Sequence, residues 1–110
     1  MLTKNNVIQL YNDGLVIRRR RKKHPQQLKG EYDPEGFEVN IYTPHLLSEH
    51  DRDMTLLHEF IHARDDRKGL PNTRPCSPRV EREAEATYRR RPGVLALIKE
   101  LYGIRSGRRE

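Results

Sequence analysis

Residues 51–67 limit the possible folds of this chain more than any other segment, because their pattern predicts one long helix. Ser48 or Asp51 is the expected N-cap, and Gly69 is expected to end the helix. Apolar side chains recur on nearly one face of this helix, so that face is expected to pack against a core. These side chains are Met54, Leu57 and Ile61.

The segments before this helix predict a short helix and three strands. Thr3 is a candidate N-cap for a helix that ends at Gly14, and residues 14–18 begin a strand. Residues 33–36 read Asp-Pro-Glu-Gly, which suits a type I turn between strands at 28–32 and 37–42. The second of these strands alternates apolar with polar residues, which predicts one core face and one polar face.

Two more helices are expected after a loop at residues 70–76. Ser77 and Pro78 supply an N-cap and a first-turn proline for one helix, and Pro92 with Gly93 ends it. The last helix is expected at residues 94–102, followed by a basic tail at 104–110. The order helix, three strands and three helices predicts an α+β fold in one domain of residues 1–103.

Composition narrows the class of protein. The chain has 110 residues, of which 34% are hydrophobic and 35% charged, so its single core must be small. The single cysteine, Cys76, excludes an internal disulfide and fits a reducing compartment. A free cysteine in a loop is the simplest interpretation of it. The sequence shows no signal peptide and no apolar run of the ~20 residues that cross a bilayer, so we expect a cytoplasmic protein without membrane association.

The long helix carries the sequence His-Glu-Phe-Ile-His at residues 58–62. On a helix, His58 and His62 share one face, so both imidazoles can bind one zinc ion. Glu59 projects beside them, where its carboxylate can take a proton from water without binding the metal. The alternative is a pair of surface histidines on a charged helix.

Zinc in a catalytic site needs a third protein ligand. The spacing of a third histidine that is typical of metzincins is absent after His62. The following helix instead offers Glu81 and Glu85 on one face, with Ala84 small enough for the two helices to approach closely. Glu81 is the candidate ligand, and Glu85 can hold the free N–H of a histidine. Glu83 lies on another side of the helix and ranks below Glu81.

The two histidines, Glu59 and the pair Glu81 and Glu85 together resemble the gluzincin family of zinc metallopeptidases. The size and element order are closest to the minimal gluzincins, and ImmA/IrrE-type peptidases come next. The resemblance covers residues 14–102, although the family more often has aspartate or asparagine where this chain has Glu85.

This resemblance implies a zinc-dependent endopeptidase with one Zn²⁺ ion and a peptide or protein substrate. It also implies that the strand at residues 37–42 pairs with extended substrate, which makes Asn40 and Tyr42 candidate substrate contacts. Members of the family can be latent, through self-association or a terminal segment across the cleft. The sequence singles out no transition-state stabiliser, and the open candidates are Tyr42, Tyr88, Tyr102 and His45.

A second class of function stays open, a regulatory or structural zinc-binding module that associates with nucleic acid or protein. The net charge is +6, and residues 18–23 form a basic run. Such a run attracts phosphates, but it lacks the interleaved aromatic residues that stack on bases. A charged, solvated strand edge is the favoured interpretation of this run, and nucleic acid is an unlikely partner.

Overall fold

The computed structural model describes residues 1–70 and 77–106, with only the backbone described for 104–106. Cys76, most of the predicted loop at 70–76 and residues 107–110 of the predicted tail lie outside these ranges. Within them, no helix is both long and apolar enough to cross a membrane.

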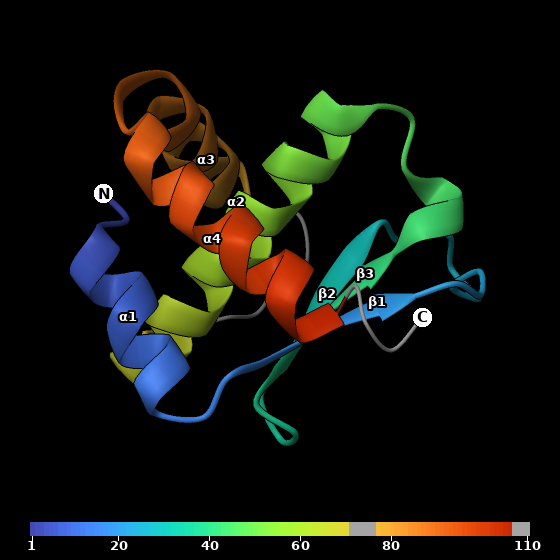
Figure 1. Ribbon diagram of the computed structural model, residues 1–110, viewed down its shortest axis with the longest axis horizontal. Coiled ribbons are helices and arrows are strands. Elements are labelled where there is room, and N and C mark those ends of the chain that lie inside the picture. The colour runs from blue at the N-terminus through green and yellow to red at the C-terminus, as the bar shows by residue number, and fades with distance from the viewer. Residues whose placement is uncertain (71–76, 107–110) are drawn as a thin grey trace.

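The predicted α+β fold is confirmed, with the expected order of one helix, three strands and three longer helices (Figure 1). The elements are α1 (Lys4–Asn12), β1 (Val16–Arg20), β2 (Gly30–Asp33), β3 (Glu38–Tyr42), a 3-10 turn (Thr43–His45), α2 (Glu49–Arg67), α3 (Pro78–Arg90) and α4 (Pro92–Ser106). Thr3 caps α1 through its side chain, Ser48 caps α2, and Gly69 follows α2 with a φ of 74°.

The last helix departs from the predicted boundaries. It starts at Pro92 and runs through Ser106, whereas the sequence predicted residues 94–102 and a tail from 104. Pro92 does end α3, but it also begins α4, because a proline is tolerated in the first turn of a helix, where its missing N–H has no partner to lose.

The sheet has the order β1-β3-β2. The hairpin of β2 and β3 is antiparallel as predicted, while β1 pairs with β3 in parallel, with Ile17 opposite Val39. The expectation that β3 pairs with substrate is therefore wrong, because β3 has a hydrogen-bonded neighbour on each side. Among the described strands, β2 has the free edge next to α2.

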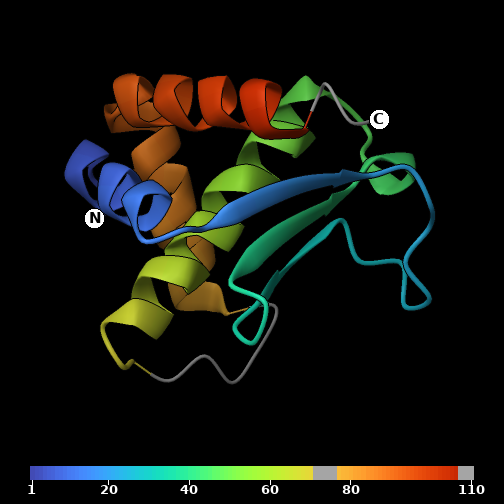
Figure 2. The ribbon, with the colours of Figure 1, turned by 60° about the horizontal axis from the view of Figure 1, so that its bottom comes forward.

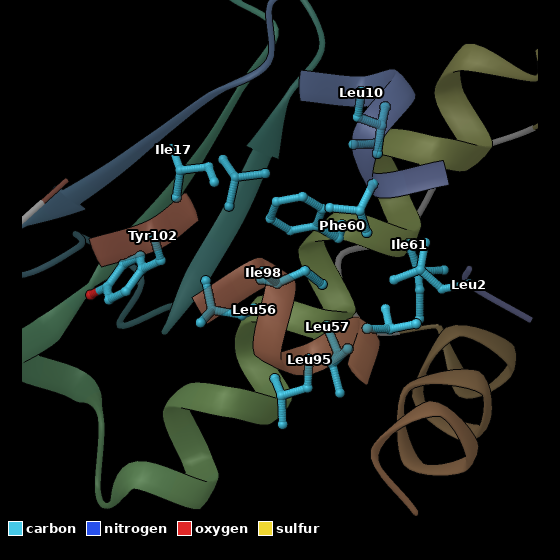
Figure 3. Packing of buried hydrophobic residues seen from close by; sticks show 14 of the residues in the cluster. Leu2, Leu10, Ile17, Leu56, Leu57, Phe60, Ile61, Leu95, Ile98 and Tyr102 are labelled. Atoms are coloured by element: carbon cyan, nitrogen blue, oxygen red, sulfur yellow. The ribbon is translucent and has the colours of Figure 1, made fainter. Parts of the chain in front are cut away.

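Helices α2 and α4 cover one face of this sheet, as Figure 2 shows for α4. The core lies between α4, α2 and the inward side chains of β1 and β3. Phe60 and Leu56 of α2, Ile98 of α4 and Ile17 of β1 point into it (Figure 3), and Phe60 and Ile98 are fully buried. This packing fixes α2 against the sheet and so positions the motif that α2 carries.

The opposite face of the sheet carries two arginines of the basic run. Arg18 and Arg20 both pair with Glu38, and Arg20 also donates to the Asn40 side chain. Arg19 turns to the other face and donates to the Tyr102 hydroxyl at 3.0 Å. Neighbouring side chains thus satisfy the arginines of β1, which agrees with a charged strand edge.

Candidate metal-binding and catalytic site

The two motif histidines lie one turn apart on α2 with their rings in contact edge to face. Their Nε2 atoms are 3.1 Å apart, and the ring centroids are 4.7 Å apart. Two nitrogens that bind one tetrahedral zinc at 2.0–2.1 Å would be roughly 3.3 Å apart. The spacing of the rings therefore fits a shared ion. His62 is almost fully buried and His58 is partly open, which gives one side of the pair access to solvent.

Glu59 lies between α2 and the free edge of β2. Its side chain is only 5% exposed, and its carboxylate accepts a hydrogen bond from the backbone N–H of Tyr32. Burial, and then the negative charge of Glu31, raise the pKa of Glu59 to about 8, while the Tyr32 N–H opposes this rise. A general base works best with a pKa near the working pH, and a bound cation nearby would lower this pKa.

The hydrogen-bond register of the hairpin explains the contact of Glu59 with Tyr32. Tyr42 N–H donates to the carbonyl of Lys29, and bonded and non-bonded pairs alternate along an antiparallel ladder. The peptide groups of Gly30 and Tyr32 consequently face away from β3. Tyr32 donates its outward N–H to Glu59. The outward N–H and C=O groups of Gly30 lie beside the motif on α2.

Gly30 allows α2 to approach the strand this closely. A Cβ atom at residue 30 would lie 2.7 Å from the Thr55 methyl group and 3.3 Å from Cγ of Glu59. The carbonyl of Asn40 would be 3.2 Å away on a third side. Because atoms of α2 and β3 surround this position, any side chain larger than hydrogen would push the motif helix away from the sheet.

Helix α3 brings the predicted glutamates to a cavity beside the motif on α2. This cavity of about 440 Å³ lies between α2, α3 and the start of β2. Its lining includes His58, Glu59, Glu81, Ala84 and Glu85. Ala84 is buried against α2, as its small size predicted, while Glu81 and Glu85 are exposed on the cavity wall.

The cavity does not hold a completed set of ligands. Among the residues that the structure describes, no three histidine, cysteine, aspartate or glutamate side chains are grouped so that they could hold one ion. The two rings have the right spacing, but the Glu81 carboxylate does not close the set with them. Glu81 is a long, exposed side chain at the start of α3, so a rotation of its own torsion angles can change its reach.

Glu83 has a different partner. It forms a two-pronged ion pair with Arg64 of α2, with Nη2 and Oε1 2.8 Å apart. Arg64 also pairs with Asp65, which in turn pairs with Arg79 at 2.6 Å. Burial alone would raise the pKa of Asp65 and that of Glu83, but the neighbouring arginine side chains lower both below their ordinary values. Glu83 therefore takes part in a contact between α2 and α3.

Several side chains that the sequence offered as candidates lie away from the cavity. Asn40 and Tyr42 belong to the central strand and face away from α2, where the Tyr42 hydroxyl donates to Glu31. The Tyr102 hydroxyl accepts from Arg19, and His45 accepts the backbone N–H of His24. Tyr88 packs edge-on against His50. None of these side chains lines the cavity beside the motif.

Sequence reasoning missed the contribution of residues 27–30 to this site. Gln27, Leu28, Lys29 and Gly30 line the cavity, and Lys29 pairs with Asp51 of α2 at 2.9 Å. The signal that could have found them is Gly30 in the middle of the predicted strand at 28–32, since a glycine inside a strand often marks a close backbone approach.

The chain was also compared with known proteins. No family model, no curated protein and no solved structure matches it.

Proposed function

We propose that this chain is a zinc-dependent peptidase that hydrolyses peptide bonds in the cavity between α2, α3 and β2. The observation that carries this proposal is that His58, the buried Glu59 and two glutamates of α3 line one cavity, while Nε2 of His62 lies 3.1 Å from that of His58. His58, His62 and Glu81 would hold the ion, and Glu81 would complete the set by turning its side chain. Glu85 would hold a ring N–H from the next turn of α3.

Bound zinc would supply Lewis-acid activation of water and of the scissile carbonyl. Glu59 does the proton transfer: its carboxylate takes a proton from the attacking water and delivers it to the leaving amine. The Tyr32 N–H holds this carboxylate in place, and burial keeps bulk water from competing for it. The strand edge at Gly30 offers outward peptide groups to which an extended substrate can add as a further strand.

The first experiment tests the metal. Protein purified without added metal should contain about one zinc per chain by elemental analysis, and His58→Ala and Glu81→Ala should each lower the zinc content. His50→Ala is a matched control, because His50 lies on the same helix and does not line the cavity. Absence of zinc from every preparation, with no uptake on addition, would refute the proposal.

The second experiment tests the base. Glu59→Gln should bind zinc like the unmodified chain and lose most peptide cleavage, because removal of a general base typically costs about 10²–10⁴-fold in rate. Cleavage would be measured on a broad library of peptides with the zinc content of each sample known. Full cleavage by zinc-loaded Glu59→Gln would show that another group takes the proton.

The alternative of a nucleic-acid-associated module has less support, since the arginines of β1 are engaged with Glu38, Asn40 and Tyr102. A shift assay with DNA and RNA at increasing salt separates the two functions. The peptidase proposal predicts weak binding that disappears as salt rises.

A further inference from the structure

An ion-pair network joins the two helices that carry the candidate ligands. Arg64 and Asp65 follow His62 on α2, and Arg79 and Glu83 flank Glu81 on α3. Arg64 contacts Glu83 through both terminal guanidinium nitrogens, and Arg79 contacts Asp65 at 2.6 Å. We call these four residues the α2–α3 clamp.

Two charged side chains of the clamp are buried to an unusual degree, while Arg79 is exposed. Asp65 is fully buried, and Arg64 is 8% exposed. Removing such charges from water costs free energy that their attraction only roughly repays, so a buried ion pair is weak evidence for stability. Its better-supported role is to favour one relative arrangement of the elements it joins. We therefore expect the α2–α3 clamp to favour one relative arrangement of α2 and α3.

The position of the clamp on α3 indicates that it controls the rotation of α3 about its own axis. The buried stripe of α3 consists of Val80, Ala84 and Thr87. At 100° per residue, Arg79 and Glu83 lie on one flank of this stripe, and Glu81 and Glu85 lie on the other. A rotation of α3 about its axis that loosened the clamp would therefore also turn Glu81 relative to the two histidines.

A small rotation is enough to matter. Side-chain ends lie about 5–6 Å from a helix axis, so a rotation of about 20° moves a carboxylate by about 2 Å. Metal–ligand distances in a working site vary by only about 0.2 Å. The buried stripe of α3 is made of small side chains. Two of them, Ala84 and Thr87, interlock little with neighbouring side chains and so hinder such a rotation only weakly.

We propose that the α2–α3 clamp fixes the rotation of α3 and so keeps Glu81 where a turn of its side chain can reach zinc, which makes Arg64 and Glu83 positioning residues. This inference rests on the proposed zinc site. It also explains why Glu83, although flanked by Glu81 and Glu85, does not serve as a ligand.

A second ion pair on α2 provides a matched control. Asp53 is 6% exposed and pairs with Arg52 at 3.0 Å and with Lys99 of α4 at 3.6 Å. It thus links α2 to another helix with similar chemistry and similar burial. A loss of stability without a change in the position of α3 is the expected effect of removing it.

The experiment compares zinc affinity, by competition with a chromogenic chelator, in Glu83→Gln, Asp53→Asn and the unmodified chain. Each is measured at a temperature where circular dichroism shows the metal-free protein to be folded. Glu83→Gln should weaken zinc binding about tenfold or more, which is the usual effect of removing a supporting contact. Asp53→Asn should leave zinc affinity unchanged even where it lowers the melting temperature.

A double variant separates position from stability. Arg64→Met with Glu83→Met replaces the pair by apolar side chains of similar length, which often restores or raises stability. Zinc affinity should stay low in this variant even when its melting temperature recovers, because the directional contact is gone. Wild-type affinity in a folded Glu83→Gln or in the double variant would overturn the clamp. Failure of the unmodified chain to bind zinc through His58, His62 and Glu81 would instead overturn the proposed function itself, and the clamp with it.

Discussion

At the scale of single residues, the site depends on the absence of a side chain at Gly30. Gly30→Ala should lower the free energy of unfolding by about 1–3 kcal/mol, because its Cβ would lie 2.7 Å from the Thr55 methyl group and force α2 off β2. Gly103→Ala is the control, since a Cβ there meets nothing within 4 Å and alanine favours helix by roughly 1 kcal/mol. Chemical denaturation measures both. Equal stability of Gly30→Ala and the unmodified chain would mean that the strand and helix are less closely packed than described.

At the scale of elements, the contact between α2 and α3 should be sensitive to acid. Burial by itself would raise the pKa of Asp65, but Arg79 and Arg64 lower it below its ordinary value of 3.8. A carboxyl with a lowered pKa in the folded state contributes stability above its unfolded pKa, and this contribution is lost as pH falls through the folded pKa. The free energy of unfolding should therefore fall below about pH 4, and Asp65→Asn should flatten that fall. Urea titrations between pH 5 and pH 2 measure it, and an unchanged slope in Asp65→Asn would contradict the assignment.

The elements themselves were largely predictable, because local signals determine their ends. Thr3 caps α1, Ser48 caps α2, and Gly69 takes a positive φ after α2, as their residue types predicted. The pairing of β1 with β3 was not predictable, since two strands separated in sequence carry no local mark of adjacency. For the same reason, β3 was wrongly expected to pair with substrate. The alternation in β3 identifies a core face but does not distinguish a central strand from an edge strand.

The candidate site was predictable to a similar depth. Residues four apart on one helix must share a face, so His58 and His62 could be paired from the sequence. Ala84 indicated close packing of α3, and it is buried there. The different surroundings of Glu81, on the cavity wall, and Glu83, in an ion pair, were not predictable, because the partner of Glu83 is Arg64 on another helix.

At the scale of the whole molecule, a chain that is only 34% hydrophobic has a small core, so a bound ion should add appreciably to its stability. A ligand present at 100 times its dissociation constant stabilises the folded state by about 2.7 kcal/mol. For a domain of roughly this size, that corresponds to a rise of about 10 °C or more in melting temperature. Zinc added to chelator-treated protein should produce this rise, measured by calorimetry or circular dichroism. His62→Ala should abolish it, and His50→Ala should retain it, because His50 packs against Tyr88 and does not line the cavity. An equal rise in His62→Ala would mean that zinc binds outside the two rings, and the site between α2 and α3 would then not be the metal centre.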